Sequence, residues 1–199
     1  MVRRFNPPRL AAGAVIAFAA AALAGCASPQ ARYYTLSLPA VTPAPSQATA
    51  PVWIEVAPVR VPERLNRVNL VLSDGNGRLR LLAQDRWSAS LPDEFRDALS
   101  QRLQASLGAV DAYQHGRSGA EPLYRVSAEV VQIDAQIDER VSAIVNWTVR
   151  RLPDGKVTVG HTRAELAAPG GVDGVVAGYQ QVVVNAAADI AAAVRSLRL

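Results

Sequence analysis

Apolar and polar residues alternate along several short segments of the chain, which is the pattern of half-buried β-strands. In the first of them Tyr34, Leu36 and Leu38 share one face, and Tyr33 lies on the other. Alternation of this kind predicts strands over 33–38, 52–59, 68–72, 78–82, 124–137, 141–149 and 157–166. Between the third and the fourth, 74–77 reads Asp-Gly-Asn-Gly and predicts a hairpin, since these dipeptides tolerate positive φ.

Two longer segments have the spacing of amphipathic helices. In the first, an apolar residue recurs every four positions, at Leu91, Phe95, Leu99, Leu103 and Leu107. Pro92 fits the first turn of this helix and Gly108 its C-terminal stop. The second helix is expected from about Asp173 to the end of the chain. A change in the apolar phase near Val130 predicts a β-bulge in the strand that contains it.

Two helices interleaved with six or seven strands predict an α/β fold with a mixed β-sheet and flanking helices. Hairpin connections make some neighbouring strands antiparallel, and the helices cover the sheet.

The N-terminus has the three parts of a secretory signal. Three arginines (3, 4 and 9) precede an apolar run over 10–23, which is too short to span a bilayer permanently. The run ends in Leu23-Ala24-Gly25-Cys26, which is similar to the bacterial lipobox, in which the cysteine thiol is acylated before cleavage. We therefore expect a cleaved signal peptide over 1–25, a lipidated tether over 26–32 and one domain over 33–199, with a flexible proline- and alanine-rich loop at 39–51.

Cleavage changes what the charge and the cysteine imply. The full chain has 21 basic and 17 acidic residues, and three of the arginines leave with the signal, so the mature balance is 18 to 17. This near-neutral balance gives no support to nucleic-acid binding. With Cys26 acylated no thiol remains, which excludes disulfides and thiolate chemistry.

The residue inventory favours neither catalysis nor a cofactor. Only His115 and His161 are available for proton transfer, and they lack the carboxylate or cysteine spacing of a metal site. Asp93, Glu94 and Asp97 gather at the start of the first helix, where a solvated polar face is the expected role. We therefore predict no enzyme, no metal and no cofactor.

Arginine and tryptophan form the remaining candidates for a contact surface. Arg86-Trp87 precedes the first helix, and Arg64 and Arg67 follow Pro62. Both residue types are favoured at interface centres. The alternative is that Trp87 packs under the helix while Arg86 is solvated.

These segments, together with the lipobox, resemble the PqiC-like, or ABC-type transport auxiliary, lipoprotein family. The similarity runs through Tyr33-Tyr34-Thr35-Leu36, then Val56-Ala57-Pro58-Val59, then Val61-Pro62-Glu63-Arg64-Leu65-Asn66-Arg67, then Arg86-Trp87-Ser88 and Leu91, then Val130 to Asp134, Trp147 and the helix after Tyr179.

The resemblance implies a three-layer mixed-sheet fold similar to the anticodon-binding or TolB amino-terminal type. It also implies a non-enzymatic role beside a periplasmic MCE-domain channel protein that carries lipid between the inner and outer membranes. The acyl chains on Cys26 would hold the domain at the inner leaflet of the outer membrane, and surfaces near Arg64, Arg67, Arg86 and Trp87 would meet the channel. A homo-oligomer is compatible with this role.

Two other classes remain open from the sequence. An envelope-assembly lipoprotein that binds lipopolysaccharide or an outer-membrane barrel fits the tether equally well. An anchored periplasmic hydrolase fits poorly, because it needs a nucleophile and a base.

Overall fold

The computed structural model describes residues 30–37, 39, 52–115, 123–152 and 154–198. The predicted signal peptide (1–25), the lipobox that includes Cys26, the start of the predicted tether and most of the predicted loop at 39–51 lie outside these residues. The described residues from Ala31 onward belong to one compact unit.

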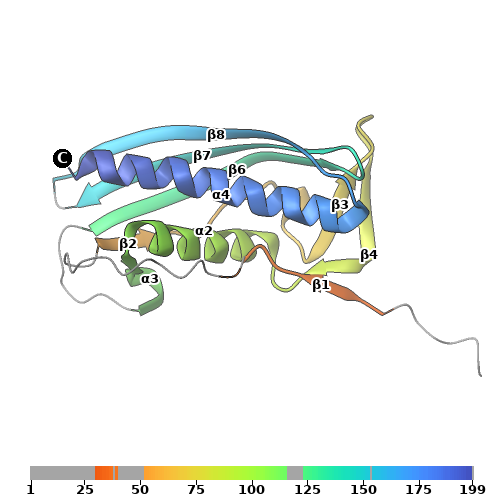
Figure 1. Ribbon diagram of the computed structural model, residues 1–199, viewed down its shortest axis with the longest axis horizontal. Helices are drawn as coiled ribbons and strands as arrows, with labels where there is room; N and C mark the ends of the chain where they lie inside the picture. The colour runs from red at the N-terminus through yellow and green to blue at the C-terminus, as the bar shows by residue number, and fades with distance from the viewer. Residues whose placement is uncertain (1–29, 38, 40–51, 116–122, 153, 199) are drawn as a thin grey trace, which may run out of the picture. The chain divides into compact units, whose positions relative to one another are not determined.

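The larger of two sheets has five strands in the order β5-β2-β6-β7-β8 (Figure 1). Their bounds are Ala109–Asp111 for β5, Val52–Val56 for β2, Leu123–Gln136 for β6, Arg140–Leu152 for β7 and Val157–Ala167 for β8. Strand β2 is parallel to both β5 and β6, whereas β6, β7 and β8 pair antiparallel. The predicted bulge is confirmed, since the pairing register of β6 with β7 shifts between Val130 and Gln132.

The smaller sheet has the order β1-β4-β3, with β1 at Arg32–Tyr34, β4 at Leu79–Trp87 and β3 at Asn69–Ser73. Strands β3 and β4 form the predicted hairpin, whose turn is closed by Asp74: its Oδ1 accepts hydrogen bonds from the backbone N–H groups of Asn76 and Arg78. Strand β1 is shorter than the predicted 33–38. It ends at Tyr34 because the Leu36 N–H donates to the Glu94 carboxylate instead of to a neighbouring strand.

Two long helices, α2 (Leu91–Leu107) and α4 (Gly171–Leu197), contact each other and the larger sheet. Both begin at the end of the domain where β1, β3 and β4 lie, and α4 terminates at the opposite end (Figure 1). Helix α2 ends at Gly108 in the left-handed conformation, as predicted. Helix α4 starts two residues before the predicted Asp173, because Asp138 Oδ1 accepts hydrogen bonds from the N–H groups of Gly170 and Gly171.

Alternation along β6 and β7 determines which face of the larger sheet is buried. The apolar side chains that face the helices are buried, as at Val126 opposite Val149 and Val130 opposite Val145. The intervening side chains, such as Glu129 and Asn146, are exposed on the other face. The predicted α/β class, with a mixed sheet and flanking helices, is therefore confirmed. Among the helices of the described residues, none is long and apolar enough to cross a membrane.

Candidate contact site at the small-sheet end

Most of the predicted contact and motif residues come together at one end of the domain. We call this the small-sheet end: β1, β3, β4, the short 3₁₀ helix η2 (Glu63–Leu65) and the first turns of α2 and α4. The predicted residues found here are Tyr33, Tyr34, Leu36, Pro62, Arg64, Leu65, Arg67, Arg86 and Trp87. Trp147 lies elsewhere, in β7. Leu23, Ala24, Gly25 and Cys26 lie outside the described residues.

Pairing of β1 with β4 brings four of the predicted motif residues together in two neighbouring pairs. Tyr33 is opposite Arg86 and Tyr34 is opposite Trp87 in parallel register. An ion pair reinforces the pairing, because the Arg32 guanidinium donates to the buried Asp85 carboxylate at 2.6–2.7 Å. Three residues of strand are thereby fixed to the domain, beginning at Arg32, the last residue of the predicted tether.

The Tyr34 hydroxyl lies between carboxylates. It donates to Asp85 Oδ1 at 3.3 Å. Burial raises the pKa of Tyr34 to about 12, and a hydrogen bond to Asp173 at the start of α4 adds to the effect. The hydroxyl therefore remains a neutral donor that links β1 to β4 and α4.

Glu94 is a central residue of this end, and the sequence did not reveal it. Its side chain is 6% exposed, whereas the sequence suggested a solvated polar face. Glu94 Oε2 accepts hydrogen bonds from the Thr35 hydroxyl at 2.9 Å and the Leu36 N–H at 2.8 Å, and Oε1 accepts one from the Ser88 hydroxyl. One carboxylate thus joins the segment after β1, the segment after β4 and the first turn of α2.

Trp87 takes the packed position and not an exposed one. Only 2% of it is exposed, and its ring centroid is 5.2 Å from that of Tyr179 in α4. The prediction that Trp87 itself forms part of a contact surface is therefore corrected: it packs beneath the helices. Arg86, on the opposite face of β4, is half-buried and donates from Nε to the Ala83 carbonyl at 3.1 Å.

The loop before β3 contains residues that pack against the domain and one predicted contact residue that is exposed. Leu65 is buried in the core, as is Leu36 in the segment after β1. Pro62 is half-buried, and its carbonyl accepts a hydrogen bond from the Leu65 N–H at 2.8 Å. Arg67 is half-buried, and its carbonyl accepts from the Leu91 N–H at the start of α2. Arg64 is exposed. Burial and the nearby Asp134 raise the pKa of Tyr179, and the Arg64 charge opposes this.

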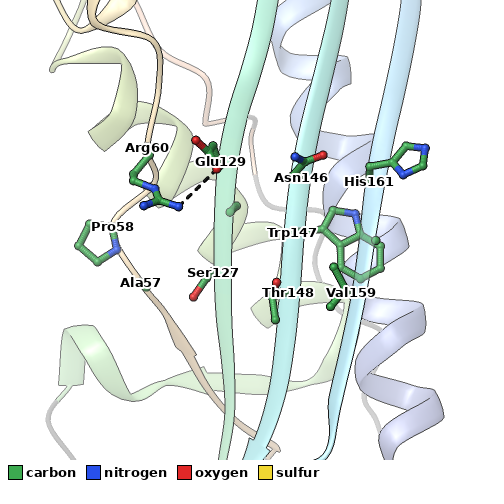
Figure 2. Close-up of a pocket in the computed structure, with 12 residues that line it drawn as sticks. Ala57, Pro58, Arg60, Ser127, Glu129, Asn146, Trp147, Thr148, Val159 and His161 are labelled. Atoms are coloured by element: carbon green, nitrogen blue, oxygen red, sulfur yellow. Dashed lines mark hydrogen bonds and ion pairs between the residues drawn. The ribbon is translucent and has the colours of Figure 1, made fainter.

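Trp147 belongs to a separate structure. Its Nε1 donates to the Thr162 hydroxyl at 3.2 Å, and that hydroxyl donates to Asp189 of α4 at 2.6 Å. Trp147 is also one of the residues that line a depression of about 740 Å³ on the face of the larger sheet that the helices leave uncovered. Figure 2 shows the polar side chains of this depression, among them Ser127, Asn146 and His161, on neighbouring strands.

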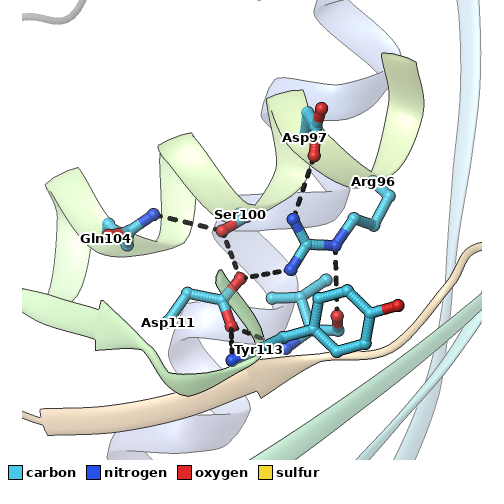
Figure 3. Close-up of polar contacts among 7 residues, drawn as sticks. Arg96, Asp97, Ser100, Gln104, Asp111 and Tyr113 are labelled. Atoms are coloured by element: carbon cyan, nitrogen blue, oxygen red, sulfur yellow. Dashed lines mark hydrogen bonds and ion pairs between the residues drawn. The ribbon is translucent and has the colours of Figure 1, made fainter. Parts of the chain in front are cut away.

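A second polar cluster, also missed from the sequence, lies between α2 and β5. Arg96 donates to the fully buried Asp111 at 2.7 Å and lies 4.6 Å from the ring centre of Tyr113 (Figure 3). Asp111 also accepts hydrogen bonds from the Ser100 hydroxyl and the Tyr113 N–H. Because the charges satisfy each other, the cluster fixes α2 to the sheet. Spacing gave no signal for it, since the two charged residues are on different elements.

The described residues supply little for metal binding or proton transfer. His161 is exposed on β8, and the side chain of His115 lies outside the described residues. Within the part of the chain that the structure describes, no three His, Cys, Asp or Glu side chains are grouped so that they could hold a metal ion.

Solved structures have the same fold. A structure described as an uncharacterized protein superimposes with a TM-score of 0.67 and 20% identity, over 83% of this chain and 99% of that chain. A protein from Xanthomonas campestris superimposes with a TM-score of 0.56 and 15% identity, over 80% of this chain and 92% of that chain. At these identities the likeness concerns the fold alone. Among curated proteins, none matches the sequence.

A family model matches residues 34–191, which covers most of the described domain and the motif residues at the small-sheet end. The chain belongs to the family of ABC-type transport auxiliary lipoprotein components. The resemblance found in the sequence is thereby confirmed. Membership implies an envelope lipoprotein that serves an ABC-type transporter.

Proposed function

We propose that this protein is the outer-membrane docking subunit of an MCE-type ABC system that moves lipid between the two membranes, and that it works without catalysing a reaction. The family match over residues 34–191 carries this proposal, because it combines a lipoprotein with ABC-type transport. In this role the protein supports membrane integrity by holding the channel protein at the outer membrane.

The proposed anchor is the acylated Cys26. Each buried methylene contributes about 0.8 kcal/mol, so two or three acyl chains hold a protein stably where one does not. The predicted tether, 26–32, then shortens to 26–31, because its last residue, Arg32, is the first residue of β1.

Burial limits which of the predicted residues of this chain can belong to the surface that we propose contacts the channel protein. Trp87 and Leu65 are buried and can only support such a surface from below. Arg64 is exposed on η2, and Arg67 follows it with its Nε buried and without a hydrogen-bond partner. We propose that Arg64 contacts the MCE-domain protein, with Arg67 held beneath it.

The test is recovery of the partner from outer membranes with the lipidated protein as bait. We expect Arg64→Glu to reduce recovery more than about tenfold, because reversing a charge at an interface costs about 2 kcal/mol or more. Arg163→Glu is the matched control, since Arg163 is an exposed arginine on β8, and its recovery should equal that of the parent.

Recovery of a lipopolysaccharide complex or an outer-membrane barrel, with no MCE-domain protein, would replace this function by envelope assembly. Equal recovery with a folded Arg64→Glu variant would remove Arg64 from the interface.

A further inference from the structure

The outer face of the smaller sheet has an unusual composition. Residues that pair across strands share a face, and so do residues two apart along one strand. Tyr33 pairs with Arg86, Arg86 with Asn69, Val71 with Leu81 and Ser73 with Leu79. The register shifts between the pairs of Asn69 and Val71, with the extra residues in β4, so it is the regular strand β3 that places Leu79 and Leu81 on the face of Arg86. Val71 is buried, and no acidic residue is among these residues. Trp87 and Tyr34 lie on the opposite face, against the core.

Large apolar side chains are exposed on this outer face. Tyr33 is 65% exposed, Leu79 46% and Leu81 48%, and Val68 beside β3 is also exposed. Half of the eight large hydrophobic side chains that are exposed in the described part of the chain thus lie on β1, β4 or next to β3. Exposed apolar side chains gathered in one place mark an interaction site rather than ordinary surface.

Arginines are frequent in the sequence around these apolar side chains. Segment 63–87 holds five arginines (64, 67, 78, 80 and 86) against three acids, and one acid, Asp85, is already paired with Arg32. Arg78 and Arg80 flank Leu79 in sequence and are exposed. An aromatic residue and leucines bordered by arginines suit the boundary between acyl chains and anionic headgroups.

The length of the chain before β1 indicates what covers this face. Only residues 27–31 separate Cys26 from Arg32, and an extended chain from one to the other spans about 20 Å at most. Helix α4, with 27 residues, extends about 40 Å from the small-sheet end to the other end of the domain. An anchor at Cys26 therefore keeps the small-sheet end within about 20 Å of the bilayer, a distance half as long as the helix.

We infer that the outer face of the smaller sheet lies on the membrane, with Tyr33, Leu79 and Leu81 at the headgroup level and Arg86 among the phosphates of anionic phospholipid. This inference rests on the proposed anchor at Cys26. It assigns Arg86 to the lipid and leaves Arg64, exposed on η2, for the protein partner.

The test uses the full mature lipoprotein in vesicles of phosphatidylethanolamine and phosphatidylglycerol. Cys26 is the only cysteine of the chain, so once it is acylated, Leu81→Cys gives a single site for a fluorescent label. Val159→Cys is the control, because Val159 is 72% exposed on β8, toward the end where α4 terminates. Phospholipids with a nitroxide near the headgroup should quench the label at Leu81 and leave the label at Val159 unquenched.

The role of the arginine is tested in the same vesicles. Arg86→Gln in the labelled Leu81→Cys protein should lower the equilibrium constant for docking of the domain on the membrane about fivefold. This is the effect of one basic residue at an anionic surface. High salt should have a similar effect on the parent, and vesicles without phosphatidylglycerol should lower the quenching at Leu81.

Three results would overturn the inference. An unquenched Leu81 label on protein that still floats with the vesicles would remove the membrane contact and leave the anchor intact. Equal quenching at both positions would mean that the domain lies flat. Protein that does not float, or whose parent form is labelled at Cys26, would contradict the anchor itself and the inference with it.

Discussion

Single carboxylates determine how the N-terminal segment of the domain is held. Glu94 accepts three hydrogen bonds from residues on two other segments, and Asp85 accepts two from β1. Hydrogen bonds to charged acceptors are stronger than neutral ones, and a buried donor that loses its acceptor is costly. Three strand residues alone would hold β1 weakly, so these two side chains secure β1, where the proposed tether would join the domain.

Replacing Glu94 by glutamine should therefore destabilise the domain and release the segment after β1. An amide brings its own N–H group toward three donors, so we expect a loss of about 2 kcal/mol in the free energy of unfolding. Denaturant titration measures this loss, and hydrogen exchange at the Leu36 amide should accelerate. Asp93→Asn is the control: Asp93 is exposed in the same turn, and its effect should stay below about 1 kcal/mol. Parent-like exchange at Leu36 in Glu94→Gln would contradict the role of this carboxylate.

Residue roles at this scale were only partly predictable. Asp93 and Glu94 are adjacent in the sequence, and nothing local indicates that one is solvated and the other buried. The difference arises from the segment after β1, which crosses the start of α2 and lies far away in sequence. Trp87 was ambiguous for the same reason, because its partner Tyr179 belongs to the last helix. Side chains whose partners lie on distant elements are not determined by periodicity.

The periodicity of apolar residues predicted the helices and strands better than it predicted the roles of single side chains. The hairpin over β3 and β4, the bulge in β6, and the two helices all follow from local patterns of apolar residues, glycine and proline. The differences concern ends, where side chains from elsewhere intervene, as Asp138 does at the start of α4. Pairing between β1 and β4, and the division into two sheets, were not predictable from alternation, because a strand pattern does not identify its neighbour.

One glycine of β8 leaves room for the side chain of Trp147 in β7. Gly160 is opposite Trp147, and a Cβ at position 160 would lie 2.3 Å from Cζ2 of the indole. The indole occupies the space above β8 and from there donates to Thr162. Residue 160 must therefore lack a side chain for the hydrogen bonds from Trp147 through Thr162 to Asp189 to form.

We expect Gly160→Ala to destabilise the domain by about 1–3 kcal/mol, since the clash is with a rigid ring in a filled site. Thermal or denaturant unfolding gives the measurement. In the double variant with Trp147→Phe the six-membered part of the indole is absent, so the clash with residue 160 is relieved. The losses in the free energy of unfolding of the two single variants should therefore sum to more than the loss of the double variant. Val159→Ala, at the exposed neighbouring position, should change stability little. If the losses in the free energy of unfolding of Gly160→Ala and Trp147→Phe were additive, the Trp147 ring would not limit the size of the side chain at position 160.

At the scale of the whole molecule, the small-sheet end is expected to have two neighbours. The proposed tether would bring it close to the bilayer, and the exposed Arg64 on η2 would remain available to a protein partner. A docking subunit of this kind needs to be in the correct membrane more than it needs a reactive group. Its sorting should therefore affect its function as strongly as its contact surface does.

Residue 27 is expected to determine which membrane the protein occupies. The lipobox resemblance implies that aspartate directly after the acylated cysteine retains a lipoprotein in the inner membrane, and this chain has alanine there. Ala27→Asp should thus move the protein from outer- to inner-membrane fractions in a density gradient, whereas Ala27→Ser should leave it in the outer membrane. The folded domain is unchanged by either substitution, so any loss of partner recovery in Ala27→Asp would come from location alone. If the parent protein already fractionated with the inner membrane, the outer-membrane docking role would be wrong, even though the family assignment would stand.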